Sequence, residues 1–198
     1  MENKSQTYIF FGRAGSGKGT QAELLIKKLE ERNRTVLSIG TGNGFRTLGE
    51  KDNYTSRITK ETVDAGNLAP VWMPIWMWGN ELVENFTGEQ DLVIDGAARR
   101  LEEAKIFDSA VKFYGLENVK VINIDVSREE SVERLTLRGR VDDVDLDRIN
   151  RRLDWHDRDV LPVLEYFQGE EGYEVINING EQSIEGVHND ISEALGLS

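Results

Sequence analysis

Apolar residues along this chain occur in two patterns, short continuous runs and helical spacings. The continuous runs are rich in valine and isoleucine, which is typical of strands that are covered on both faces of a sheet. They predict strands at Tyr8–Phe11, Thr35–Ile39, Asp91–Ile94, Val119–Val126 and Tyr173–Ile178. Between the runs, apolar residues recur every three or four positions, which indicates one buried helical face. The helices predicted from this spacing are Thr20–Arg32, Glu102–Phe113, Glu129–Arg138, Leu146–Phe167 and Ile184–Leu195.

This alternation of strands and helices predicts the fold class. We expect an α/β protein in which a parallel five-stranded sheet is flanked by helices, with ligands bound at the carboxyl ends of the strands. Ser127 and Glu130 have the spacing of a capping box, and they mark the start of the helix after the fourth strand.

A glycine-rich loop follows the first predicted strand, in the sequence FFGRAGSGKGTQ from Phe10 to Gln21. Its glycines and its lysine have the spacing of a P-loop, in which backbone amides and a helix N-terminus bind phosphate. One position differs, because Gly19 follows Lys18 and the hydroxyl residue Thr20 comes one place later. The loop predicts a site for nucleotide phosphates. A flexible turn between strand and helix is the alternative.

Charge and composition limit the ligands and the location of the protein. The 198 residues carry a net charge of −12, which argues against general nucleic-acid binding. A polyanionic substrate must then be bound by locally clustered arginines. No apolar run approaches the length that spans a membrane, and the start, MENKSQ, lacks the apolar stretch of a signal peptide. The chain has no cysteine, so we expect no thiolate metal site, and we expect a cytoplasmic location.

The Gly-Lys-Gly-Thr-Gln form of the loop resembles the adenylate kinase branch of the nucleoside monophosphate kinases, although that family usually has proline at the position of Ala14. The resemblance spans nearly the whole chain and implies a single P-loop NTPase-type domain. Its core would comprise residues 1–40, 71–138 and 144–198, with a mobile segment for the nucleoside monophosphate (NMP) at about 41–70 and a short lid at about 139–143.

The same resemblance implies an activity. The family transfers the γ-phosphate of ATP-Mg to a nucleoside monophosphate, and AMP is the acceptor that we expect first. The alternatives are a kinase for another acceptor (GMP, CMP or UMP) and a catalytically inactive regulator that binds nucleotides.

The resemblance also assigns residues to ATP and to the transferred phosphate. The residues assigned to ATP are Gly12, Gly15, Ser16, Gly17, Lys18, Gly19, Thr20, Arg134 and Gln182. The residues assigned to catalysis are Lys18, Arg138, Arg140 and Arg152. Asp95 would hold Mg²⁺ through water, and no zinc is expected because the long lid that sometimes carries zinc is absent.

The acceptor nucleotide is assigned to the loops after the second and third strands. Ser38–Arg46 is similar to the family's Ser-Thr-Gly-Asp-x-x-Arg, and Asp95–Arg99 is similar to its Asp-Gly-Phe-Pro-Arg. Ala97 and Ala98 replace the Phe-Pro pair, so we expect a less rigid loop. The residues assigned to the acceptor are Thr41, Gly42, Arg46, Arg99 and Glu103.

Glu103 falls where the family has a glutamine that contacts adenine. An ionised glutamate accepts hydrogen bonds but cannot donate one to adenine N1. We therefore expect looser discrimination among acceptor bases than is usual in the family, with AMP use improved by Glu103→Gln. The alternative is that Glu103 points to solvent and contacts no base.

A segment rich in tryptophan and methionine runs from Trp72 to Trp78. It is predicted as a helix, because Trp72 with Trp76 and Met73 with Met77 are four residues apart. We expect core packing beneath the acceptor site, and contact with another subunit is the alternative. A monomer is favoured, and an oligomer through Trp72–Trp78 remains the other possibility.

Overall fold

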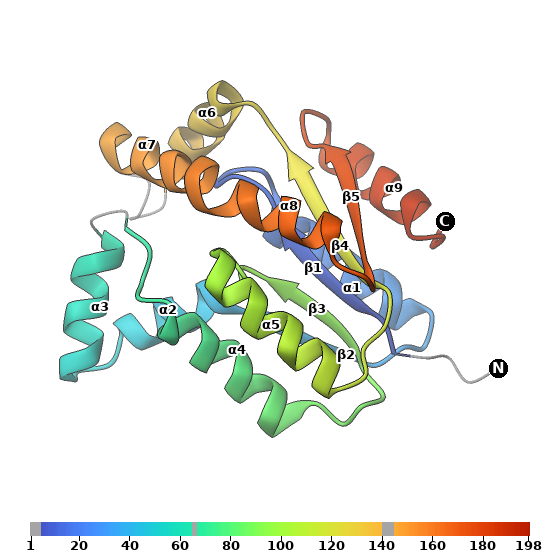
Figure 1. Cartoon of the computed structure of the whole chain (residues 1–198). Helices are drawn as coiled ribbons and strands as arrows, with labels where there is room; N and C mark the ends of the chain where they lie inside the picture. The colour runs from blue at the N-terminus through green and yellow to red at the C-terminus, as the bar shows by residue number, and fades with distance from the viewer. Residues whose placement is uncertain (1–4, 65–66, 140–144) are drawn as a thin grey trace.

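The computed structural model describes residues 5–64, 67–139 and 145–198, and within these ranges a five-stranded parallel sheet forms the centre of the molecule (Figure 1). The strand order is β2-β3-β1-β4-β5, and every neighbouring pair is parallel. The strands are β1 (Thr7–Phe11), β2 (Val36–Gly40), β3 (Asp91–Asp95), β4 (Val119–Asp125) and β5 (Tyr173–Asn179). The predicted fold class is confirmed, and all of the predicted strands are present.

Alternate residues of the central strands enter two separate cores. From β1, Tyr8 and Phe10 pack with the helices α1 (Lys18–Glu31) and α9 (Ile184–Ala194) on one face of the sheet. Ile9 and Phe11 pack on the other face, against the helices α4 (Trp72–Asn85), α5 (Leu101–Phe113) and α8 (Leu161–Gly169). Because both faces are covered, the carboxyl ends of the strands are the part of the sheet that remains for ligands.

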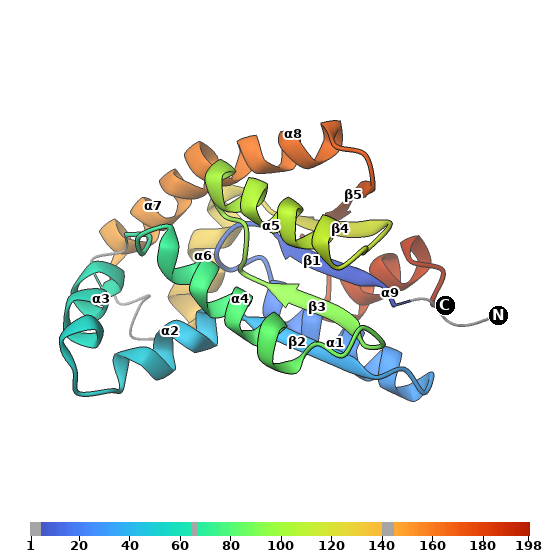
Figure 2. The same cartoon turned by 60° about the horizontal axis from the view of Figure 1, so that its bottom comes forward.

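Four further helices lie beyond that carboxyl edge. They are α2 (Thr41–Gly49), α3 (Tyr54–Asp64), α6 (Arg128–Arg138) and α7 (Leu146–Trp155). In both views α2, α3 and α7 lie at the end of the molecule toward which the strand arrows point (Figure 2). Leu135 of α6 packs with Ile149 and Leu153 of α7 in a third, small core. This small core fixes α6 and α7 to each other.

The helix predicted at Leu146–Phe167 is present, but a π-helical turn interrupts its regular α-helical geometry. After α7 the chain makes a π-helical turn, η2 (His156–Val160), and α8 then begins at Leu161. Both His156 and Val160 are buried in η2. Helical spacing alone does not distinguish one extra residue in a turn from a regular α-helix, and such turns are frequent at functional sites.

The capping box predicted at Ser127 is half present. The Ser127 Oγ accepts a hydrogen bond from the Glu130 backbone N–H at 3.2 Å. The return bond does not form, because the Glu130 side chain accepts from Arg134 instead, at 2.6 Å. The Ser127 backbone N–H donates to Glu181 after β5, at 2.7 Å. The start of α6 is thereby tied to the turn that follows β5.

The tryptophan-rich segment divides between the core and the surface. Met73 and Trp78 are buried as expected, but Trp72 and Trp76 are 59% and 55% exposed, so the expectation of core packing is wrong for these two. The reason is helical geometry, because residues 72 and 76 share one face of α4 and residue 78 lies on the opposite side.

Among the described helices, none is both long and apolar enough to cross a membrane.

The small core between α6 and α7 yields a stability prediction. Leu135 is fully buried there, whereas Leu137 on the same helix is 79% exposed. Leu135→Ala is expected to lower the free energy of unfolding by about 3 kcal/mol, because it leaves a cavity. Leu137→Ala is the matched control and is expected to change it by less than about 0.5 kcal/mol. Urea unfolding measures both, and equal effects would contradict this account of the core.

Candidate active site

The P-loop turns closely around the end of β4 and leads directly into α1. Gly12 has φ 139°, and a Cβ there would lie 2.4 Å from the carbonyl oxygen of Ile124, so only glycine fits. Gly17 is the N-cap of α1 and supplies no capping side chain. The first amides of α1 therefore face the loop, which is the arrangement that binds phosphate. Lys18 Nζ donates to the carbonyl oxygens of Gly12 and Arg13, at 2.8 Å each.

Positive charges from three parts of the chain converge on one cavity, which we call the central cavity. Its polar lining comes from Lys18, Arg99, Arg152, Trp155 and His156. Burial lowers the pKa of Lys18 to about 8, opposed by Asp95 and reinforced by Arg99, Arg152 and Arg138. Burial also lowers the pKa of Arg99, and Arg152 adds to that shift.

Like charges repel strongly in a partly desolvated site, so a cluster of this kind is costly without an anion. A polyphosphate is an anion that would satisfy all of these groups at once. The central cavity therefore has the charge and the loop geometry of a phosphate-binding site.

Asp95, the last residue of β3, brings a carboxylate to the same place. A Cβ on Gly19 would lie 3.6 Å from Asp95 Oδ2, so the carboxylate faces the start of α1. Its Oδ1 is buried and has no hydrogen-bond partner among the described residues. A buried carboxylate oxygen of this kind fits a hydrated Mg²⁺, which usually binds one or two carboxylates together with substrate phosphates. In the described part of the chain, no group of three or more His, Asp or Glu could hold a metal by itself.

A second cavity adjoins the first. It is lined by Thr41, Phe45, Leu68, Ala69, Pro74, Gly96, Arg99, Arg100 and Glu103. Gly96 and Arg99 line both cavities, so the Arg99 side chain lies between two compartments. The Thr41 hydroxyl donates to the carbonyl oxygen of Gly96 at 2.6 Å and joins the loop after β2 to the loop after β3. Two adjoining cavities that share an arginine suit two phosphate-bearing ligands.

Glu103 braces the loop that carries Arg99. Its Oε1 accepts from the backbone N–H of Ala98 at 2.7 Å and from Trp78 Nε1 at 3.2 Å. Its Oε2 accepts from the backbone N–H of Arg99 at 2.9 Å. Burial raises the pKa of Glu103, and the hydrogen bonds from Arg99, Ala98 and Trp78 oppose that rise. The side chain is 2% exposed, so the alternative in which Glu103 points to solvent is wrong. Contact with the acceptor base stays a prediction.

Ala98 explains why this loop needs such a brace. Its φ is 54°, which is uncommon for a residue other than glycine. Proline fixes φ near about −65°, so it cannot take this conformation. The loop is held by hydrogen bonds from Ala98 and Arg99 to Glu103, where the family's loop has a proline ring.

Three other predicted site residues, Arg134, Gln182 and Arg138, line neither cavity. Arg134 donates to the carbonyl oxygen of Gly180 at 2.8 Å, which brings it to the turn that contains Gln182. Gln182 is exposed and donates to Asn179 and Asp190. Arg138 is exposed on α6 but contributes to the charge around Lys18.

Arg46 and Arg140 are the remaining predicted phosphate-binding arginines. Arg46 is exposed on α2, where it bonds to Asn43, and it lines neither cavity. Arg140 lies outside the described residues.

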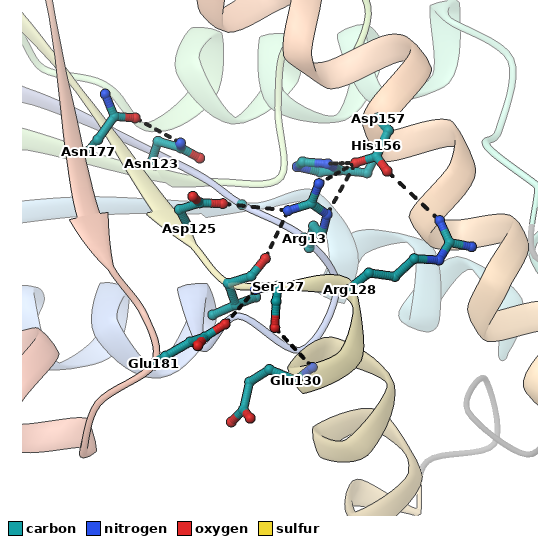
Figure 3. Close-up of polar contacts among 12 residues, drawn as sticks. Arg13, Asn123, Asp125, Ser127, Arg128, Glu130, His156, Asp157, Asn177 and Glu181 are labelled. Carbon is teal, nitrogen blue, oxygen red and sulfur yellow. Dashed lines mark hydrogen bonds and ion pairs between the residues drawn. The ribbon is translucent and has the colours of Figure 1, made fainter.

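Sequence reasoning missed a cluster behind the P-loop (Figure 3). Arg13 donates to Asp157 Oδ1 from Nε and Nη2, at 3.1 and 2.8 Å, and to the carbonyl oxygen of Val126 at 2.8 Å. Asp157 also lies beside His156, which lines the central cavity. A signal was present, because His156 follows Arg152 by four residues and so shares its helical face.

Comparison with known proteins identifies the family. The family model described as adenylate kinase matches residues 10–172. The adenylate kinase of Corynebacterium diphtheriae is 32% identical, and the alignment covers 95% of this chain and 98% of that protein. Adenylate kinase 1 of a Nostoc species is 29% identical over 95% of this chain and 97% of its own. The adenylate kinase of Mycobacterium leprae is 35% identical over 82% of this chain and 86% of its own. With a family match over most of its length and relatives that align from end to end, this chain belongs to the adenylate kinase family.

Proposed function

We propose that this protein transfers the γ-phosphoryl group of ATP to AMP and forms two molecules of ADP. The observation that carries the proposal is the convergence of Lys18, Arg99 and Arg152 on one cavity at the P-loop. Family membership supports the same reaction.

Positioning and charge neutralisation account for the chemistry. Phosphoryl transfer demands in-line geometry and compensation of the charge on the transferred oxygens, with little covalent work for the protein. The loop amides and Lys18 hold the donor phosphates, and Arg152 and Arg138 neutralise the transferred group. Arg99 lies between the cavities, so it can hold the acceptor phosphate beside the donor. An ionised phosphate oxygen is the nucleophile and needs no general base.

Mg²⁺ would enter with ATP, and Asp95 is the residue that we assign to its hydration shell. The ion supplies further neutralisation of phosphate charge. The carboxylate of Asp95 contributes a fixed acceptor for the ion's water ligands, and its buried, unpaired Oδ1 supports that role.

The acceptor segment at 41–70 and the lid at 139–143 are proposed to move over the core when both nucleotides bind. Exposed Arg46 supports this proposal, because it lines neither cavity although its neighbour Phe45 does, so a movement of α2 or of its own side chain is needed before it contacts an acceptor phosphate near Arg99. Closure would exclude water, which otherwise competes as the phosphoryl acceptor.

A monomer is proposed, as expected from the sequence, because one chain supplies residues assigned to both nucleotides. The cytoplasmic location expected from the sequence stays part of the proposal.

Turnover with ATP-Mg and AMP tests the proposal, and Lys18→Met supplies the decisive variant. The wild type is expected to form ADP from both nucleotides, and Lys18→Met is expected to lower kcat by at least about 100-fold, because a charge at the transferred phosphates is lost. Lys27→Met, at an exposed position of the same helix, is the control and should retain full activity. Normal turnover by a folded Lys18→Met protein would contradict the P-loop assignment.

Glu103→Gln separates two roles for that residue. A glutamine places an NH₂ group against one of the backbone donors of Ala98 and Arg99, so the loop is expected to loosen. The KM values for AMP, GMP and CMP should then rise together, by about tenfold, while the KM for ATP stays constant.

The control for Glu103→Gln is Glu102→Gln, at an exposed position of the same helix, which should leave all KM values unchanged. Improved use of AMP relative to GMP and CMP would instead show that Glu103 contacts the base, as the sequence suggests.

Hydrogen exchange tests the proposed closure. The bisubstrate analogue in which five phosphates join two adenosines should protect amides in segments 41–70 and 139–143, because both would fold over the bound phosphates. Amides in β1 and β4 serve as the internal reference, since they are already protected in the sheet. Exchange that is unchanged at saturating analogue would rule out the movement.

A further inference from the structure

His156 combines burial with an unused hydrogen-bonding atom. It belongs to η2, is 3% exposed and lines the central cavity together with Lys18 and Arg152. Its Nδ1 lies 3.3 Å from Asp157 Oδ1, and its Nε2 has no partner among the described residues. A buried ring nitrogen without a partner is costly unless a ligand provides one.

Asp157 fixes the tautomer of this histidine (Figure 3). Burial opposes ionisation of Asp157, but hydrogen bonds from His156 and Arg13 outweigh burial and lower its pKa. Arg128 of α6 adds charge, with its Nη1 3.8 Å from Asp157 Oδ2. An ionised carboxylate can only accept, so Nδ1 of His156 carries a proton and its N–H donates a hydrogen bond to Asp157. The neutral ring then presents only a lone pair at Nε2.

Cations lie close enough to the His156 ring to lower its pKa. Burial lowers the pKa of His156 to about 4, Lys18 and Arg13 add to the shift, and Asp157 opposes it. Arg152 precedes His156 by one helical turn, and Arg99 reaches the same cavity from the loop after β3. Around neutral pH the ring is therefore uncharged in the free protein.

Trp155 gives an independent indication that this segment faces a ligand. Its Nε1 is buried and also lacks a partner among the described residues, and Trp155 lines the same cavity. The Arg99 guanidinium lies over its ring, 5.7 Å from the centroid. Two consecutive residues thus hold unpaired ring nitrogens beside a cluster of cations.

We propose that His156 is a phosphate-binding residue: it takes up a proton from solvent when a polyphosphate enters the central cavity, and it donates Nε2–H to a phosphate oxygen while Asp157 orients the ring. The proposal deepens the proposed function and rests on it. One proton is bound per polyphosphate: an N–H bond forms at Nε2, an O–H bond of a solvent hydronium ion breaks, and no other covalent bond changes.

Electrostatics gives the direction of this change. The bound phosphates offset the charges of Lys18, Arg13, Arg99 and Arg152, which disfavour a second proton on the ring. A nearby anion raises the pKa of a histidine, typically by about 1–3 units. The protonated ring then contributes a charge-assisted hydrogen bond, which is about twice as strong as a neutral one.

Nuclear magnetic resonance of the imidazole rings tests the proposal directly, because the chain has two histidines. In the free protein, His156 should be neutral from pH 6 to 8, the range above its pKa of about 4. With the five-phosphate analogue bound, its pKa should rise by about three units, to about 7. His188 on α9 is the internal reference and should not change. The analogue has no terminal phosphate, so its own second ionisation does not interfere.

Variants test the contribution to binding. His156→Asn keeps a donor for Asp157 but has no atom at the place of Nε2, so it should weaken analogue binding about tenfold at pH 6. The loss should be smaller at pH 8, where fewer wild-type rings are protonated. His156→Gln places an amide near the Nε2 position and should restore part of the affinity without the pH dependence below pH 7. Lys18, whose pKa burial lowers to about 8, also titrates near this range, so each variant is compared with the wild type at the same pH.

The outcomes separate this inference from the proposed function. A wild-type protein that binds no analogue and forms no ADP would overturn both. Analogue binding with an unchanged, neutral His156 at pH 6, or equal affinity in wild type and His156→Asn, would overturn the role of His156 alone. His188→Asn is the control variant and should bind the analogue as the wild type does.

Discussion

Repulsion between like charges is the constraint on which this structure depends. Lys18, Arg99 and Arg152 are brought from three separate segments to one partly desolvated cavity, although the chain as a whole is strongly negative. Such an arrangement is unfavourable in the free protein and favourable once phosphates enter. Relief of the repulsion between the cations then contributes to the binding free energy of the ligand. The rest of the fold serves to keep these groups from moving apart.

The two hydrophobic cores provide that rigidity. Because each strand is covered on both faces, the carboxyl edge of the sheet is held in place by packing that does not involve the cavity. Thr41 and Glu103 then fasten the loops after β2 and β3 to each other and to α5. The ion pair between Arg13 and Asp157 fastens the P-loop to η2. The polar contacts thus connect parts of the site that the cores alone would leave independent.

The sequence predicts those features that depend on neighbouring residues. Buried parallel strands are continuous apolar runs, and the glycine spacing identifies the P-loop, so the sheet and the phosphate site were both foreseeable. Helix α2 was not predicted because its sequence, TGNGFRTLG, contains three glycines, which disfavour helices in isolation.

Contacts between residues far apart in the chain could not be predicted from the sequence. Arg13 and Asp157 are 144 positions apart, and nothing in either neighbourhood indicates the other. The brace at Glu103 was missed for a related reason, because the side chain was compared with the base that the family binds and not with the backbone beside it. Its partners are amides, which every residue except proline possesses.

The π-helical turn has a consequence for the direction in which the side chains of α7 point. A residue in an α-helix turns the chain by about 100°, so the additional residue in η2 sets the rotation of α7 relative to α8. Arg152 lies on one face of α7, and another face, that of α8, packs on the sheet. The angle between these two faces therefore differs from the angle that one regular α-helix would give. A chain shortened by one residue within 156–160 could keep both helices and both hydrophobic faces, yet its arginine would point away from the cavity. In this protein the direction of a side chain is thus encoded by the length of a turn several residues away.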